Sequence, residues 1–123
     1  MTDVTVERPA YKNHPLWIEA IALAHQTYAV ADALAGRDPE EAHRLRRLAV
    51  SVPALLAGAL EAEHEPERAA DVSEARAALR DLASSAERLT GLPAASNDLP
   101  RRAQALDGSV ALELGLADGG WLC

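Results

Sequence analysis

The sequence predicts an all-α fold, namely an antiparallel up-down-up-down bundle of four helices with a proline-kinked second helix. Alanine, the best helix former, supplies 27 of the 123 residues, whereas there are only two Trp, two Tyr and no Phe. Between breaker residues, apolar residues recur at intervals of three and four, as on one face of a helix. The connections between these stretches are only a few residues long, which favours antiparallel neighbours.

The length is that of one domain, and we expect it to span 1–123. The helices are expected at about 15–35, 39–63, 66–90 and 99–116, with flexible tails at 1–14 and 117–123. Glycines fall where helices would end and prolines near where helices would begin. These residues are Gly36, Gly91, Pro39, Pro66 and Pro100.

Each expected helix has an apolar stripe at helical spacing. In 66–90 the stripe is Val72, Ala75, Leu79, Leu82, Ala86 and Leu89. In 15–35 it is Trp17, Ala20 or Ile21, Ala24, Tyr28, Ala31 and Leu34. In 99–116 it is weaker and comprises Leu99, Ala103, Leu106, Val110 and Leu114.

The second expected helix begins with a capping box, in which Asp38 accepts from a backbone N–H and Glu41 reaches back. Its residues 48–60 are almost entirely apolar and form two stripes at 100° per residue. One stripe would face the bundle core: Leu45, Leu48, Ala49, Val52, Leu56, Ala59 and Leu60. The reverse carries small residues that a single bundle would leave uncovered, which predicts an oligomer interface. These are Val50, Ala54, Ala57 and Gly58.

Pro53 lies in the middle of this helix and removes one helical hydrogen bond, to Ala49, at about 3 kcal/mol. We therefore expect a kink, with Ser51 satisfying backbone groups beside it. Ser51 has no nucleophile-elbow glycines around it, so a structural role is favoured over a catalytic one.

Charge and cysteine content limit the class of protein. The net charge is −7 and the pI about 5.0, against the basic footprint of a dedicated nucleic-acid binder. The single cysteine, Cys123, cannot form an internal disulfide, and its surroundings favour an unreactive thiol. The N-terminal residues include acidic groups and no apolar segment, so we expect no signal peptide and no membrane anchor. We expect a cytoplasmic protein that does not associate with membranes.

The run LRRLAVSVPALLAGA (45–59), together with Trp17, Ala20, Ala24 and Tyr28, resembles a known family. It is similar to LRRAAVSIPANIAEG, the hallmark of the four-helix-bundle proteins encoded by intervening sequences of bacterial 23S ribosomal RNA genes. The resemblance covers roughly residues 13–92 and is specific mainly in the central run. It implies a cytosolic homopentameric ring without enzymatic activity.

A branch of that family is the accessory variability protein of diversity-generating retroelements, which is similar in fold, is basic, and binds nucleic acid and a reverse transcriptase. The present chain departs from that branch in charge. It also departs from the family run at Leu55, Gly58 and Ala59, where Asn, Glu and Gly are usual.

No constellation in the sequence predicts chemistry, so we expect no enzyme, no catalytic residue, no metal and no cofactor. Glu40-x-x-His43 and Glu61-x-x-His64 have the spacing of di-iron motifs, but both are assigned to the second helix, roughly 30 Å apart. Each is better explained as a solvated pair at a helix end. His25 is expected at the edge of the core.

Two features leave alternatives open. The cluster Arg44, Arg46 and Arg47 could contact a nucleic-acid backbone or pair with carboxylates of a neighbouring helix or subunit. Pairing is favoured, because the field of an acidic chain opposes a polyanion. Trp121 and Leu122 either end the chain in disorder or dock on another subunit.

The favoured function is therefore a non-enzymatic homo-oligomer, a pentamer by the resemblance, that assembles or binds another macromolecule. The alternative is a nucleic-acid-binding accessory protein that uses the arginine cluster. A metal or small-molecule site inside the bundle has the least support, because the sequence shows no inward-facing carboxylate cluster.

Overall fold

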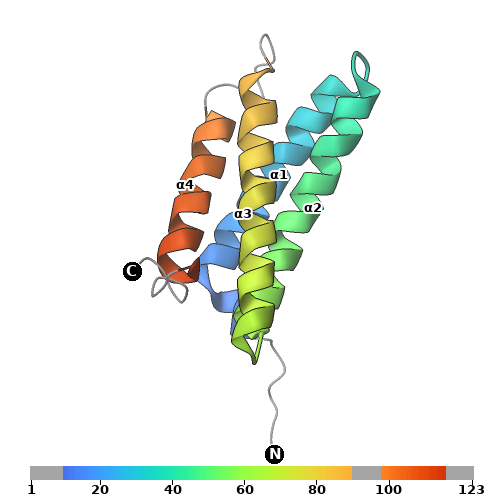
Figure 1. Ribbon diagram of the computed structural model, residues 1–123. Helices are drawn as coiled ribbons and strands as arrows, with labels where there is room; N and C mark the ends of the chain where they lie inside the picture. The colour runs from blue at the N-terminus through green and yellow to red at the C-terminus, as the bar shows by residue number, and fades with distance from the viewer. Residues whose placement is uncertain (1–9, 90–97, 116–123) are drawn as a thin grey trace, which may run out of the picture.

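Four helices packed against one another form the structure, a computed structural model that describes residues 10–89 and 98–115 (Figure 1). The helices are α1 (Pro15–Leu34), α2 (Pro39–Glu61), α3 (Glu65–Glu87) and α4 (Asp98–Glu113). A short 3₁₀ helix, η1 (Ala10–Asn13), precedes them and contacts α1 and α2, within the segment that the sequence assigns to a tail. No strand occurs in the described ranges. The all-α class and the four helices are therefore confirmed.

Capping side chains explain where the first two helices begin. His14 Nδ1 accepts the N–H of Leu16 at 3.1 Å at the start of α1. Asp38 Oδ1 accepts the N–H of Glu41 at 3.2 Å at the start of α2, as the capping box predicts. The other half of the predicted box is wrong: the carboxylate of Glu41 lies 3.4 Å from Arg44, and the N–H of Asp38 donates to the carbonyl of Leu34 at 2.9 Å instead.

The boundary between α2 and α3 corrects one assignment. α2 ends at Glu61, and His64 is the N-cap residue of α3. The two residues of the Glu61-x-x-His64 spacing therefore belong to different elements. Extended backbone at Ala62 and His64 ends one helix and begins the next, which periodicity alone does not reveal.

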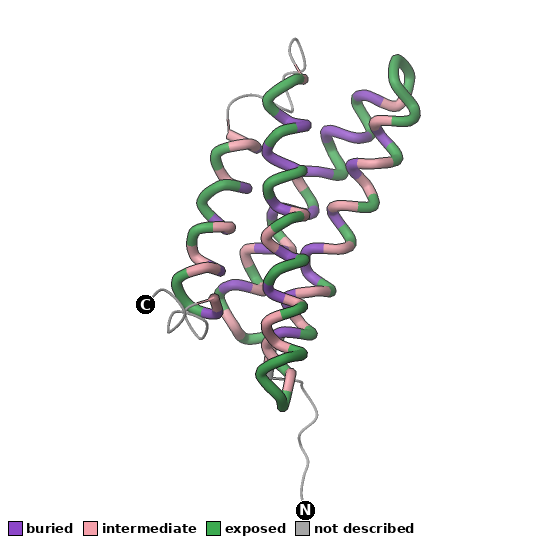
Figure 2. Tube along the Cα trace, viewed as in Figure 1, coloured by how far each residue is buried: buried purple, intermediate pink, exposed green. Residues whose placement is uncertain are grey.

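The core lies between the inward faces of the helices (Figure 2). Each helix packs against the next one along the chain, and α1 also packs against α4. The stripes expected in 66–90 and 99–116 are confirmed, since all their members are buried except Leu89, which is half-buried against the core. Leu89 and Leu114 lie just beyond the ends of α3 and α4. On α2 the core stripe is likewise confirmed, with Leu48 and Leu60 half-buried at its margins.

The expected face of α1 is partly wrong. Trp17 and Ile21 are half-buried and Tyr28 is 38% exposed. The buried positions lie around a neighbouring line of the helix: Leu16, Ala20, Leu23, Ala24, Thr27, Val30, Ala31 and Leu34. Thr27 is tolerated in the core because its hydroxyl donates to the carbonyl of Leu23 at 2.8 Å.

Trp17, which the sequence assigns to the apolar stripe of α1, packs against η1. Its ring packs edge-to-face on Tyr11 of η1, with centroids 5.4 Å apart and planes at 71°. This contact fastens η1 to α1 at the periphery of the bundle. None of the helices in the described part of the chain combines the length and the apolar character that a bilayer span requires.

Candidate functional site

The outward face of α2 is the part of the structure that carries the expected oligomer interface. Val50 is 56% exposed, Ala54 and Gly58 are exposed, and Ala57 is half-buried. The other candidates for this interface, Trp121 and Leu122, lie outside the described residues, as does Cys123. Four neighbouring positions of one helix therefore present small or apolar groups to solvent.

Gly58 has a second reason to be small. A Cβ atom at this position would lie 2.6 Å from the Oδ2 atom of Asp71 on α3. The missing side chain therefore gives room to a carboxylate of the same chain. For this reason Gly58 alone is weak evidence for the approach of another helix, and Val50 and Ala54 carry more of the argument.

Two of the three clustered arginines have carboxylate partners on neighbouring helices. Arg44 lies 3.6 Å from Asp81 of α3 and also bonds the hydroxyl of Ser85, which is fully buried. Arg46 lies 2.7 Å from Asp32 of α1. For these two residues the structure therefore shows the ion pairing that the sequence favours.

Arg47 differs from its neighbours. It is exposed, and it has no ion pair among the residues that the structure describes. Its backbone carbonyl accepts the hydroxyl of Ser51 at 2.8 Å. Arg47 is therefore the member of the cluster whose guanidinium is available to a partner.

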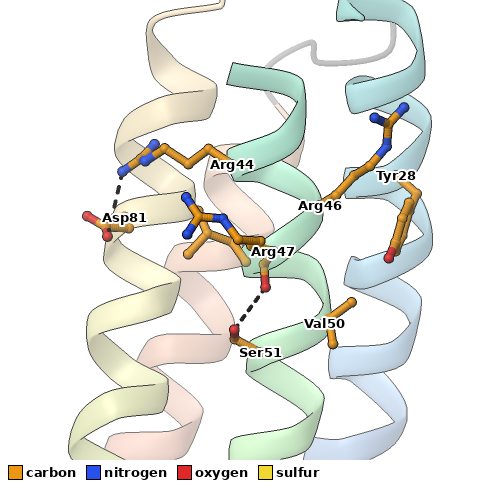
Figure 3. Close-up of a pocket in the computed structure, with 8 residues that line it drawn as sticks. Tyr28, Arg44, Arg46, Arg47, Val50, Ser51 and Asp81 are labelled. Carbon is orange, nitrogen blue, oxygen red and sulfur yellow. Dashed lines mark hydrogen bonds and ion pairs between the residues drawn. The ribbon is translucent and has the colours of Figure 1, made fainter. Parts of the chain in front are cut away.

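The three arginines line an open hollow of about 580 Å³ on the side of the bundle where α1, α2 and α3 meet (Figure 3). Tyr28, Leu48 and Val50 add apolar surface, and Asp81 adds a negative charge. Within and around the hollow, Asp81, Asp32 and Glu41 offset the arginines in number. The hollow is therefore not a strongly positive site.

Ser51 and Pro53 lie where the sequence places them, inside a continuous α2. Pro53 is buried. The carbonyl that a proline at this position leaves without its helical donor is that of Ala49, whereas the Ser51 hydroxyl bonds Arg47. The Ser51 hydroxyl thus bonds a backbone carbonyl near Pro53, but that carbonyl lies about half a turn before the carbonyl of Ala49.

Metal ligation finds no support in the described ranges, which contain no group of three His, Cys, Asp or Glu side chains able to share an ion. Glu40 and His43 are both exposed on the first turns of α2. His25 is exposed on α1 and not at the core edge. Within the described ranges, these histidines therefore have no neighbouring ligands with which to form a metal site.

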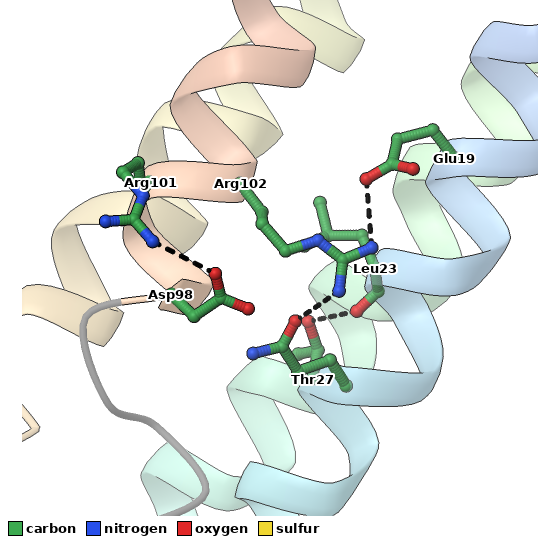
Figure 4. Close-up of polar contacts among 7 residues, drawn as sticks. Glu19, Leu23, Thr27, Asp98, Arg101 and Arg102 are labelled. Carbon is green, nitrogen blue, oxygen red and sulfur yellow. Dashed lines mark hydrogen bonds and ion pairs between the residues drawn. The ribbon is translucent and has the colours of Figure 1, made fainter.

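Sequence reasoning missed the polar contacts that attach α4 to the rest of the bundle. Arg102 bonds Glu19 at 2.9 Å and Gln26 at 2.7 Å, both on α1 (Figure 4). Asp107 accepts from Arg76 of α3 at 2.8 Å. Contacts between residues 31 to 83 positions apart give no local signal in a single sequence.

A second omission could have been found in the sequence. Within 15–34, Glu19 and Asp32 are the only Asp, Glu, Lys or Arg residues, so α1 cannot cover its outward face with charge. Ile18 is accordingly 53% exposed, and Ala22 and Ala29 are exposed. α1 therefore also has uncovered apolar surface.

Comparison with protein-family models, with curated proteins and with solved structures gives no match. The likeness to the proteins of ribosomal intervening sequences therefore rests on the residues quoted above and stays a prediction.

Proposed function

We propose that this protein is a non-enzymatic, cytoplasmic homo-oligomer whose outward α2 face is the contact between copies. The observation that carries the proposal is that face, on which Val50 and Ala54 are exposed and Ala57 is half-buried, in a helix whose opposite side is already buried. Exposed apolar surface of this kind marks contact surfaces in folded proteins. The chain would act as an assembly module or present the assembled surface to another macromolecule.

The composition of the core supports self-association. Many of the buried side chains are alanines, which remove little apolar area from water. A bundle of this kind gains stability by burying further apolar surface between copies. The exposed Ile18 and Ala22 of α1 add to the area that such a contact could cover.

The proposed architecture of each copy is the antiparallel up-down-up-down bundle with a kink at Pro53. The connections support it, because only residues 35–38 separate α1 from α2 and residues 62–64 separate α2 from α3. Links of this length favour antiparallel neighbours. A buried proline within α2 supports the kink, since proline removes a hydrogen bond from the helix interior.

The resemblance implies five copies, which for a 13.1 kDa chain corresponds to about 65 kDa. Size-exclusion chromatography with multi-angle light scattering measures this mass directly. We expect a species heavier than one chain at micromolar concentration. A well-folded monomer at that concentration would contradict the proposal.

A matched pair of variants assigns the contact to α2. Ala54→Glu introduces a charge into the proposed interface and should reduce the mass, whereas Ala77→Glu, at an exposed position in the middle of α3, should leave it unchanged. Both replace alanine inside a helix, so their effects on helix propensity are alike. Equal masses for the two variants would place the contact elsewhere.

The alternative function, a nucleic-acid-binding accessory protein, is favoured by one observation: Arg47, which lines the hollow, is exposed and has no ion pair among the described residues. Binding of labelled single-stranded RNA or DNA at low salt should then weaken in Arg47→Ala and as salt rises. Absence of binding at low salt removes this alternative.

A further inference from the structure

The exposed stripe of α2 has opposite charges at its two ends. It includes Arg47, Val50, Ala54, Gly58 and Glu61, spaced by steps of three and four residues, so that all of them lie on one side of the helix. Arg47 and Glu61 are both exposed, and neither has an ion pair within the described part of the chain. The middle of the stripe is apolar or small. A partner for this surface therefore needs a small-residue centre, an acid at one end and a base at the other.

The stripe is symmetric in position about Ala54. Arg47 and Glu61 each lie seven residues from Ala54, about 10 Å along the helix axis at 1.5 Å per residue. Val50 and Gly58 each lie four residues away, about 6 Å. Reversing the direction of the helix thus exchanges the base for the acid and the larger apolar residue for the smallest one.

From this symmetry we infer that two copies of the chain pack α2 against α2 in antiparallel orientation, about a two-fold axis beside Ala54. The inference rests on the self-association proposed above and specifies its geometry. Arg47 of each copy then pairs with Glu61 of the other, and Val50 packs against Ala57 of the other copy, because the space at Gly58 holds the carboxylate of Asp71. A two-fold contact of this kind uses the same patch on both copies.

Charge distribution selects the antiparallel arrangement over the parallel one. Parallel packing in register would bring the two Arg47 side chains together, and the two Glu61 side chains together, so that both ends would repel. In the antiparallel arrangement the end that receives Arg47 also carries Asp71, whose carboxylate lies beside Gly58. The small side chains at the centre let the two helix axes approach to the short end of the usual 8–10 Å range.

The symmetry of the α2 contact limits the number of copies in an assembly. An isologous contact closes at two chains, about 26 kDa here, whereas a ring of five needs head-to-tail contacts. Together with a ring contact on another face, the α2 contact would give ten copies. An assembly of five is incompatible with it, because five copies cannot all pair two by two.

Charge reversal is the first test, with Kd for association measured by analytical ultracentrifugation. Arg47→Glu and Glu61→Arg should each raise Kd at least about tenfold, because the symmetry places each substitution in the interface twice. The double variant restores both pairs and should return Kd to within about threefold of the original. Circular dichroism of each variant checks that the bundle is folded.

A cross-link at the axis is the second test and does not depend on charge. In a Cys123→Ser background, Ala54→Cys should oxidise to a covalent dimer, since residues at the axis can bring their Cβ atoms within disulfide reach. Ala77→Cys on α3 is the control and should remain unlinked.

The outcomes separate this inference from the proposed function. If neither charge reversal changes the Kd of association and Ala54→Cys does not cross-link, the α2 geometry is wrong. Self-association itself is then still supported. A monomeric unmodified chain overturns both. Rescue by the double variant together with the covalent dimer supports the two-fold contact.

Discussion

Gly58 lies inside α2 and Gly108 inside α4. Replacing each of them by alanine and comparing the free energies of unfolding tests what surrounds α2 at Gly58. A Cβ atom at Gly108 on α4 would meet nothing within 4 Å, whereas at Gly58 it would lie 2.6 Å from Asp71 Oδ2. Alanine is more favourable than glycine in a helix interior by about 1 kcal/mol. Gly108→Ala should therefore gain about 1 kcal/mol, which for a chain of this length raises Tm by roughly 4 °C.

Gly58→Ala should gain less. The new methyl group displaces the Asp71 carboxylate, which is the far end of a flexible side chain and can turn away at a cost of about 0.5–1 kcal/mol. The net gain is then about 0–0.5 kcal/mol. In the double variant with Asp71→Ala the displaced group is gone, and the gain from alanine at position 58 should return to about 1 kcal/mol.

Urea unfolding followed by circular dichroism measures these free energies. All variants are compared at one chain concentration, because association makes apparent stability depend on concentration. A loss of more than about 1 kcal/mol in Gly58→Ala that Asp71→Ala does not relieve would refute the reasoning. Such a loss would indicate that something other than this carboxylate occupies the space above Gly58.

Three further substitutions test the bundle, each by urea unfolding. Leu56→Ala, at a core position that is 0% exposed, should destabilise by about 2–5 kcal/mol, and a loss below about 1 kcal/mol would contradict the packing. Asp38→Ala removes the N-cap of α2 and should cost about 1 kcal/mol, whereas no change would show that the cap is not formed. Arg102→Ala removes bonds from α4 to α1 at a partly exposed site and should cost at most about 1 kcal/mol, with faster amide exchange in α4. Arg101→Ala, which affects a bond within α4, is the control. Equal losses of stability in the two variants would contradict the idea that Arg102 holds α4 against α1.

The fold was predictable where a helix has one apolar face, and less so where it has several. α3 and α4 alternate apolar and charged residues, so their buried positions follow from spacing alone. α1 carries only two charged side chains, Glu19 and Asp32, and several lines along it are equally apolar. The large rings of Trp17 and Tyr28 therefore led to a wrong prediction of the buried face. The face that is buried contains the polar Thr27.

The candidate surface was only partly predictable for a different reason. The uncovered stripe of α2 follows from its own sequence, because both sides of the helix are apolar. The carboxylate of Asp71 beside Gly58 depends on how α3 lies against α2. The partners of Arg44 and Arg46 likewise come from other helices, at separations that a single sequence does not encode locally.

These ion pairs bear directly on the choice between functions. With Arg44 and Arg46 engaged by Asp81 and Asp32, the cluster retains one guanidinium without a partner in the described residues, that of Arg47. One contact with a phosphate gives only weak, slightly salt-dependent binding, with a slope near −0.9 on duplex DNA, and the net charge of −7 opposes it. The same single guanidinium is sufficient for a two-fold contact, because symmetry supplies it twice and sets it against Glu61 each time. The charge pattern that makes α2 a poor surface for a polyanion is therefore the one that suits a second copy of the chain.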